Sequence, residues 1–279
     1  MAMSKQMASS EKGTQVPQGK KQGQVSKLDG RALFKKWLKA AKKTSSPGVS
    51  VYTERSDKRS IGLSILRELL GDHFVGEETI LKAGGYSKSA AIIANSLPTN
   101  KRVQSGDLGE LLATEYLNSE TTFAVPIKKL RWKDDRETAM RGNDVIGVDN
   151  REKPIRVMKV ECKSRAQFSK ATVEEAATNL ELHDGRPNPS TLAFITKRLY
   201  EEKRDDEAKV FQDLQSGGAI SAENITHLIF ALAGNDPSSH LANWSKSKFH
   251  EIKRKSAAIV VQGHGDFVTA VYETHGTKS

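Results

Sequence analysis

The sequence predicts a mixed α/β fold in which a mixed sheet is flanked by helices. Three observations support this prediction: a well-marked helical pattern at 107–117, a block of short apolar runs and polar turns at 122–161, and long helical segments followed by more strand-like runs near the C-terminus. At 279 residues the chain is long enough for one large domain with a substantial core. We expect that domain to span 49–279.

The first 46 residues hold most of the excess positive charge. They carry eleven Lys or Arg and two acids, which is +9 of the net +10, whereas the remaining 233 residues hold 33 bases and 32 acids. Residues 1–27 are rich in Gln, Gly, Ser and Lys and have almost no large apolar side chains, so we expect a disordered basic arm there.

Residues 28–48 are expected to form a basic amphipathic helix, over about 28–43, and a linker. Four apolar residues recur at helical spacing opposite a lysine-rich face: Leu33, Phe34, Trp37 and Leu38. Such a helix can bind nucleic-acid phosphates, dock on a partner, or simply pack on its own domain with a solvated lysine face. The sequence leaves these alternatives open.

The remaining elements follow from apolar spacing and turn residues. Strands are expected at 49–53, 122–128, 144–148, 155–161, 227–232, 257–262 and 266–273, the last two joined by a Gly-His-Gly turn. Helices are expected at 61–70, 77–83, 89–96, 107–117, 170–182 and 191–214. The polar stretch at 149–153 favours a hairpin between the strands on either side of it.

Composition excludes several classes of protein. The longest apolar runs are far too short to span a bilayer, and the N-terminal stretch does not resemble a signal peptide, so we expect a cytoplasmic protein. The single cysteine, Cys162, excludes an internal disulfide and a multi-cysteine zinc site.

Charged residues within two apolar stretches are the strongest functional signal. Asp144 lies two residues after a glycine at the start of one run, and Glu161 and Lys163 flank Cys162 at the end of another. Because side chains alternate along a strand, Glu161 and Lys163 project to one side, which we expect to be the more open one, and Cys162 projects to the core. The hairpin would bring Asp144 close to Glu161.

Two neighbouring carboxylates repel unless a cation lies between them. Mg²⁺ prefers oxygen ligands and usually takes one or two protein carboxylates, leaving positions for water and a substrate phosphate. A lysine beside the metal-binding acid can orient the attacking water and neutralise developing charge. The pattern therefore favours metal-assisted phosphodiester hydrolysis, although a Glu and a Lys on the solvent face of an edge strand need no function.

The stretches "GND" at 142–144 and "VECK" at 160–163 resemble the PD-(D/E)XK nuclease superfamily, which has the restriction-endonuclease-like fold. The resemblance implies a catalytic core at about 103–275 with N-terminal helical additions. It implies that Asp144 and Glu161 bind Mg²⁺ or Mn²⁺ and that Lys163 assists the water. Asn143 stands where the superfamily name has proline, a position that we expect to vary freely.

The superfamily often adds a glutamate on the helix before the sheet, in a G-x-x-x-E arrangement. Gly106 and Glu110 match that spacing, so Glu110 is our choice for a third metal-supporting acid. A helical wheel of 107–117 instead places Glu115 nearer the apolar stripe. The G-x-x-x-E spacing thus favours Glu110, and the helical wheel favours Glu115.

More narrowly, "GDLGELLATEYL", "RGNDVIGVD" and "VECKSR" resemble the HamA family, nuclease subunits of the Hachiman antiphage defence system, over roughly 50–275. The resemblance implies a Mg²⁺-dependent deoxyribonuclease acting with a HamB-type superfamily 2 helicase. Two alternatives remain at this point: a non-catalytic DNA-binding adaptor of a helicase complex, and a restriction or repair endonuclease.

Overall fold

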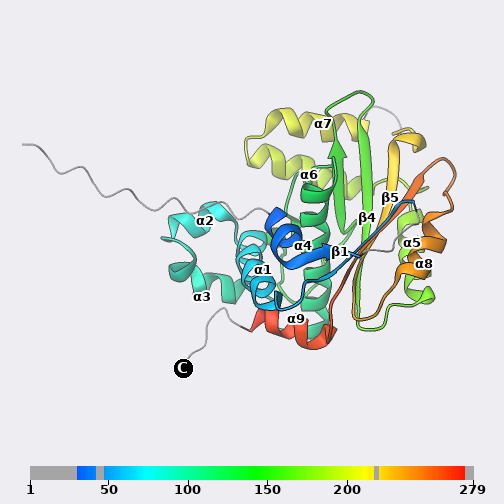
Figure 1. Cartoon of the computed structure of the whole chain (residues 1–279). Helices are drawn as coiled ribbons and strands as arrows, with labels where there is room; N and C mark the ends of the chain where they lie inside the picture. The colour runs from blue at the N-terminus through cyan, green and yellow to red at the C-terminus, as the bar shows by residue number, and fades with distance from the viewer. Residues whose placement is uncertain (1–29, 42–46, 217–219, 274–279) are drawn as a thin grey trace, which may run out of the picture.

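The computed structural model describes residues 30–41, 47–216 and 220–273. Across these ranges the strands form one mixed six-stranded sheet in the order β1-β2-β6-β5-β4-β3 (Figure 1). The four inner strands, β2, β6, β5 and β4, run parallel to one another. The edge strands β1 and β3 are antiparallel to their neighbours β2 and β4. The strands are β1 (Leu38–Ala40), β2 (Val49–Glu54), β3 (Val145–Asp149), β4 (Arg156–Arg165), β5 (Ile225–Ala233) and β6 (Lys253–Val260).

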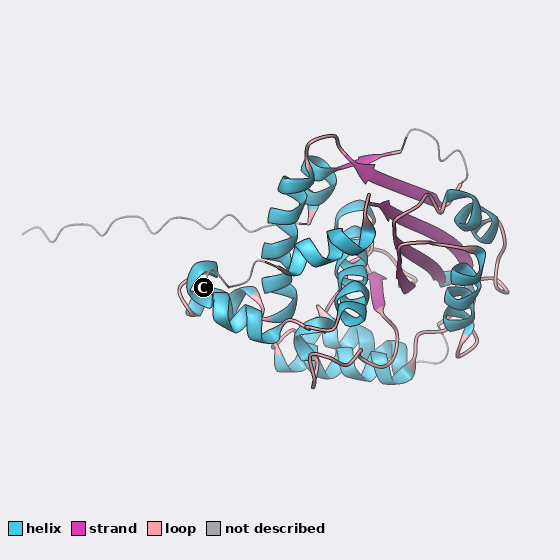
Figure 2. Cartoon of the chain, turned by 90° about the horizontal axis from the view of Figure 1, so that it is seen from below, coloured by secondary structure: helices cyan, strands magenta, loops and turns pink. Residues whose placement is uncertain are grey.

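Helices cover both faces of the sheet. The described α-helices are α1 (Arg59–Phe74), α2 (Glu77–Lys82), α3 (Tyr86–Ser96), α4 (Lys101–Glu120), α5 (Lys170–Glu181), α6 (Pro189–Glu201), α7 (Asp205–Ser216), α8 (Ser238–Ser245) and α9 (His264–Tyr272). Helices α1, α4 and α9 pack on one face, α5 and α8 pack on the other, and α6 and α7 pack against β3 (Figures 1 and 2). The expected α/β class is confirmed.

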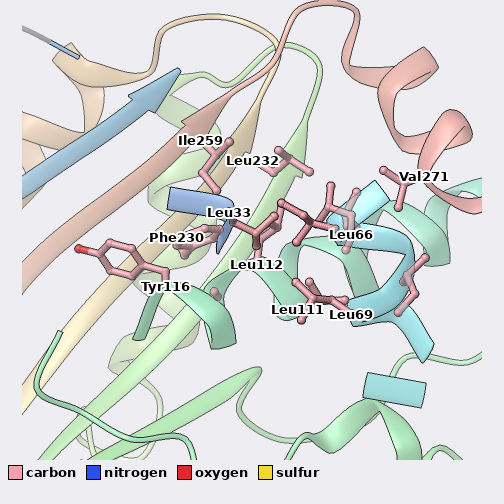
Figure 3. Packing of buried hydrophobic residues seen from close by; sticks show 14 of the residues in the cluster. Leu33, Leu66, Leu69, Leu111, Leu112, Tyr116, Phe230, Leu232, Ile259 and Val271 are labelled. Carbon is pink, nitrogen blue, oxygen red and sulfur yellow. The ribbon is translucent and has the colours of Figure 1, made fainter. Parts of the chain in front are cut away.

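The core is largest where β5 crosses the centre of the sheet. Leu228, Phe230 and Leu232 face α1 and α4, and the intervening Ile229 and Ala231 face α5 and α8. A continuous apolar run is typical of a parallel strand buried on both faces. Figure 3 shows the first of these layers, in which Leu112 and Tyr116 of α4 lie beside Phe230 of β5, and Leu111 lies beside Leu69 of α1.

Helix α4 is held close to β4. Its N-terminus is capped by Asn100, whose side chain accepts hydrogen bonds from the amides of Arg102 (2.9 Å) and Val103 (3.4 Å). A Cβ on Gly109 would lie 3.6 Å from the Cβ of Ser164. The helix backbone therefore lies against the end of β4 that carries Glu161 and Lys163.

Two expected strands are wrong. Residues 122–128, all described, make a single antiparallel bridge between Ala124 and Val148, and the chain then enters the 3₁₀ turn η2 (Lys129–Trp132). Pro126 cannot donate to a ladder, which limits pairing there. Residues 266–273 belong to helix α9, because Phe267, Val268, Val271 and Tyr272 are buried at helical spacing.

Two helices also differ from expectation. The helix expected at 191–214 is two helices, α6 and α7, separated by a turn in which Lys203 has a positive φ of 58°. The helix expected over 28–43 is confined, in the described part, to residues 31–37, where one short α-helical step leads into the π-helical segment η1 (Leu33–Trp37) before the chain enters β1. Leu38 pairs with Glu54 in the sheet while its side chain is fully buried, so residues 38–40 join the domain.

The basic arm at 1–27 lies outside the described residues.

Within the described ranges, no helix has the length and apolar character needed to cross a membrane. The third short helical turn, η3 (Ala222–Asn224), leads into β5.

Candidate active site

The expected hairpin is confirmed and brings Asp144 to β4. Strands β3 and β4 are antiparallel, with Val145 opposite Val160. Asp144 comes immediately before β3, and its Oδ2 accepts a hydrogen bond of 2.7 Å from the backbone amide of Cys162. The first acid therefore lies beside the Glu161–Lys163 segment although it is distant in sequence.

The "GND" stretch is held by the start of α6 and by a lysine. Gly142 has a φ of +92°, and a Cβ there would lie 2.3 Å from Thr191 Oγ1, so this position requires glycine. The Asn143 amide donates to Thr191 Oγ1 (3.0 Å), its Oδ1 accepts from the Asn188 amide (2.7 Å), and its carbonyl accepts from Lys129 Nζ (2.8 Å). Asn143 thus fixes the backbone that carries Asp144, a role that the sequence analysis missed.

Glu161 and Lys163 project to the same face of β4, as expected, but that face is covered by α5. Lys163 Nζ donates to Glu161 Oε1 (2.8 Å) and to Glu175 Oε1 (2.9 Å). Asn179, one helical turn after Glu175, donates to the same Glu161 oxygen at 2.7 Å. The exposed fractions of Glu161 and Lys163 are 9% and 7%, so the expectation of an open side is wrong.

Lys159 explains why this face is closed. Its side chain is buried next to Glu161 on the same face, and its Nζ donates to three carbonyls at 2.9 Å, those of Leu180, Leu182 and Arg186. These contacts tie the C-terminal end of α5 to the sheet. Glu175 and Asn179 were missed from sequence, although their spacing of four residues places both on one face of a helix.

Glu110 joins the cluster from the opposite helix, α4. Its side chain is 12% exposed, and Lys129 Nζ lies 3.6 Å from its Oε2. That oxygen is buried and accepts no hydrogen bond from any residue in the described part of the chain. An orphaned buried carboxylate oxygen is costly, which makes it a candidate ligand atom.

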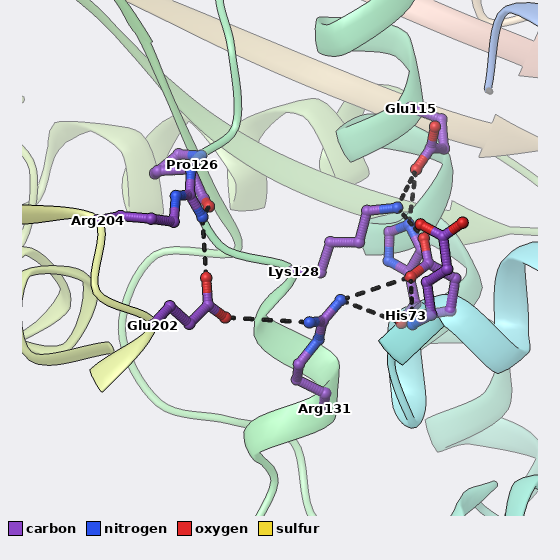
Figure 4. Close-up of polar contacts among 9 residues, drawn as sticks. His73, Glu115, Pro126, Lys128, Arg131, Glu202 and Arg204 are labelled. Carbon is purple, nitrogen blue, oxygen red and sulfur yellow. Dashed lines mark hydrogen bonds and ion pairs between the residues drawn. The ribbon is translucent and has the colours of Figure 1, made fainter. Parts of the chain in front are cut away.

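Glu115 lies in a different environment. Its Oε1 contacts His73 Nε2 at 2.7 Å and Lys128 Nζ at 3.4 Å, and Lys128 also pairs with Asp72. Burial works against the charge of Glu115, but His73 and Lys128 outweigh it and lower the pKa of that carboxyl. Figure 4 shows the network continuing through Arg131 to Glu202 and Arg204. Glu115 therefore belongs to a compensated ion network.

The acids of the cluster are only partly compensated. Burial, followed by repulsion from Glu110 and Glu161, raises the pKa of Asp144 well above its usual range. Burial also raises the pKa of Glu110, although Lys129 opposes this. Burial works against the Lys163 ammonium, but Glu161 and Glu175 outweigh it and raise its pKa. Carboxylates perturbed by both burial and like charge are typical of functional sites.

The donor set fits a hard divalent cation, since it offers carboxylate oxygens, one of them orphaned. Among the described residues, however, no three His, Cys, Asp or Glu side chains are arranged to hold a metal ion. Glu161 Oε1 is engaged by Lys163 and Asn179. Binding of an ion by all three acids therefore requires their side chains to move closer together, with the second oxygen of Glu161 as its nearest available donor atom.

Two cavities adjoin the cluster. One of about 20 Å³ is lined by Glu110, Asp144 and Lys129 and has room for about one water molecule. The other, of about 500 Å³, lies between the 134–141 loop and the start of α6. Thr191 lines both cavities, so the acids lie next to a space of ligand size.

The fold and this cluster define a mixed α/β protein with a buried carboxylate–lysine site near the β3 edge of its sheet. The chain belongs to the HamA family, whose sequence model matches residues 31–274. The match includes every residue of the cluster, and it begins before η1.

A curated relative is "Hachiman protein HamA" of Bacillus cereus. It is 33% identical over 135 residues, which are 47% of this chain and 48% of the relative. The similarity thus spans about half of each protein.

Proposed function

We propose that this protein is a metal-dependent nuclease that hydrolyses phosphodiester bonds in DNA. The observation that carries the proposal is the proximity of three acids and a lysine: Glu110 and Asp144 line one small cavity, Asp144 accepts from the amide next to Glu161, and Lys163 is bonded to Glu161. A structural role alone does not explain why repelling, partly compensated acids are kept together in a buried place. The resemblance to the PD-(D/E)XK superfamily supports the same reading.

In this proposal, Asp144 and Glu161 hold Mg²⁺ or Mn²⁺, and Glu110 supports the ion or its water shell. The bound ion would supply Lewis-acid activation of water and of the phosphate. Lys163 orients the attacking water and offsets negative charge that develops on the phosphate. Glu175 and Asn179 position Lys163 and Glu161 through the hydrogen bonds described above.

We further propose an antiphage defence role for the protein as the cytoplasmic nuclease partner of a HamB-type superfamily 2 helicase. Membership of the HamA family and the name of the Bacillus cereus relative support this role. Co-purification of the protein with the product of a neighbouring helicase gene tests the partnership. Recovery of this protein alone, with both proteins expressed, contradicts it.

Cleavage of linear DNA in Mg²⁺ by Asp144→Asn and Glu161→Gln tests the chemistry. Both substitutions keep an oxygen that can accept the hydrogen bonds from Cys162 and Asn179. We expect each to slow cleavage by at least about 100-fold, the scale of losing one preorganised electrostatic group. Glu174→Gln, on the exposed side of α5, is the matched control and is expected to cleave normally. Undiminished cleavage by a folded Asp144→Asn protein contradicts the proposal.

A non-catalytic DNA-binding adaptor is the second candidate. The engagement of Glu161 by Lys163 and Asn179 favours it, because these contacts close the site. An adaptor would retard DNA in EDTA and leave it uncut in both Mg²⁺ and Mn²⁺. A metal-dependent nuclease would cut it.

A further inference from the structure

The larger cavity beside the acid cluster has the size and lining of a ligand site. Its volume of about 500 Å³ lies within the range of small-molecule pockets. Its lining combines two cations, several hydroxyl groups and apolar side chains: Lys129, Arg141, Thr138, Ser190, Thr191, Met140, Ala139 and Phe194, with Asp134 and Asp135 at the loop. None of these side chains is among the acids that would bind the metal.

The cavity is continuous with the proposed reaction site. Lys129, Thr191 and Phe194 line both the larger cavity and the small one that contains Glu110 and Asp144. A polymer whose phosphate lies at the acids therefore has its neighbouring unit in the larger cavity.

Its polar end is suited to a phosphate. Lys129 is fixed there by its hydrogen bond to the Asn143 carbonyl, and Arg141 is exposed at the rim. Thr191 Oγ1 accepts from the Asn143 amide, which leaves its hydroxyl hydrogen to donate. The carboxylate of Asp135 is occupied locally, since it accepts from the Glu137 amide (2.9 Å) and Thr138 Oγ1 (3.0 Å).

Its apolar end is suited to a base. The Phe194 ring is half-buried, and the Arg198 guanidinium lies 5.2 Å from the ring centroid. Arg198 in turn lies 4.2 Å from the Trp132 ring, so the phenylalanine is backed by a stacked pair. Bases pack on aromatic rings without regard to sequence. A paired base remains inside its duplex, so only an unpaired base can enter a cavity of this size.

We propose that this cavity binds one unpaired nucleotide of the DNA strand, next to the phosphate that is cut, with its phosphate at Lys129 and Arg141 and its base against Phe194. The inference rests on the proposed nuclease function and names its substrate more narrowly, as a strand that is unpaired at the cut site.

Binding without cleavage tests the inference. Fluorescence anisotropy in Ca²⁺ would compare a short labelled oligothymidylate with a blunt-ended linear duplex that has no unpaired nucleotides. We expect Phe194→Leu to weaken oligothymidylate binding by about tenfold, the scale of one lost base–aromatic stack, and to change duplex binding by less than about twofold. Phe211→Leu is the matched control. Phe211 packs in the apolar contact between α6, α7 and β3, as Phe194 does in part, but it does not line the cavity.

Arg141→Ala keeps the test decisive if Phe194→Leu fails to fold, because Arg141 is exposed. We expect it to weaken oligothymidylate binding and to reduce the salt dependence by about one phosphate contact. Equal losses for both probes, or unchanged binding by a folded Phe194→Leu and by Arg141→Ala, overturn the inference. Tight binding to the duplex alone also overturns it and leaves the proposed nuclease intact, whereas binding to neither probe contradicts both.

Discussion

Two glutamates on one helix occupy opposite electrostatic environments. Glu110 and Glu115 lie five residues apart on α4, so they point about 140° away from each other around the helix. Each has a lysine from the same short segment beside it: Lys129 is 3.6 Å from Glu110, and Lys128 is 3.4 Å from Glu115. The pKa of Glu115 is lowered and that of Glu110 is raised.

The difference shows that the charge of Glu115 is stabilised by its surroundings, whereas the charge of Glu110 is destabilised by its surroundings. Glu115 has His73 as well as Lys128, and both of its partners offset its burial. Glu110 has Lys129, but it also feels Glu161, and one of its oxygens has no hydrogen bond within the described ranges. An acid that remains partly uncompensated is the better candidate for function.

Replacing Glu115 by Gln removes the charge of the compensated glutamate. We expect a loss of about 3 kcal/mol in the free energy of unfolding at pH 7, because Lys128 loses a buried counter-charge and the hydrogen bond to His73, whose own pKa is lowered by burial, loses its charged partner. Since the pKa of Glu115 is lowered by folding, this contribution is present above pH 4.5 and fades as the pH falls below it. Urea unfolding measures the change.

Glu174→Gln is the surface control for this prediction. It removes one partner of an exposed ion pair with Lys170, which contributes less than about 0.5 kcal/mol. A Glu115→Gln protein as stable as the control would show that the ion network contributes nothing to folding.

Replacing Lys129 by Met removes the positive charge beside the partly compensated Glu110. We expect Mn²⁺ to bind about tenfold more tightly to Lys129→Met, because removing a nearby positive charge favours a cation by on the order of 1 to 2 kcal/mol. Mn²⁺ titration followed by electron paramagnetic resonance measures it without any cleavage.

Two variants control for indirect effects. Lys129→Arg keeps the charge and should bind Mn²⁺ like the unchanged protein. Lys128→Met removes the neighbouring lysine, which contacts Asp72 and Glu115, and should lower stability without changing Mn²⁺ affinity. Weaker Mn²⁺ binding by Lys129→Met would mean that Lys129 mainly supports the loop through Asn143.

The smallest expected effect is on the pH dependence of stability. Folding raises the pKa of Glu110 above its value of 4.5, so its contribution to stability is complete below pH 4.5 and is lost as the pH rises. Glu110→Gln lacks this titration. Between pH 4.5 and pH 8 the unchanged protein should therefore lose free energy of unfolding relative to Glu110→Gln, as measured by urea unfolding at each pH. Parallel pH profiles would contradict the uncompensated state of Glu110.

The sequence by itself determined the local part of this protein. Alternation along 156–165 placed Glu161 and Lys163 on one face and Cys162 on the other, and the polar turn at 149–153 predicted the hairpin that carries Asp144. These features depend on neighbours in the chain or across one turn, which apolar spacing reports directly. The same spacing misassigned 266–273, because a short apolar run fits either a strand or a buried helix.

Only the tertiary structure decided which residues surround the candidate acids. Asn143 is fixed by Asn188 and Thr191, and Glu161 is bonded by Asn179; these partners come from helices later in the chain. The choice between Glu110 and Glu115 depended on which face of α4 meets β4 and which meets His73, and a helical wheel has no information on either neighbour. Burial and charge at this site are properties of packed elements, and for that reason the sequence could propose candidate acids but not show how they are held.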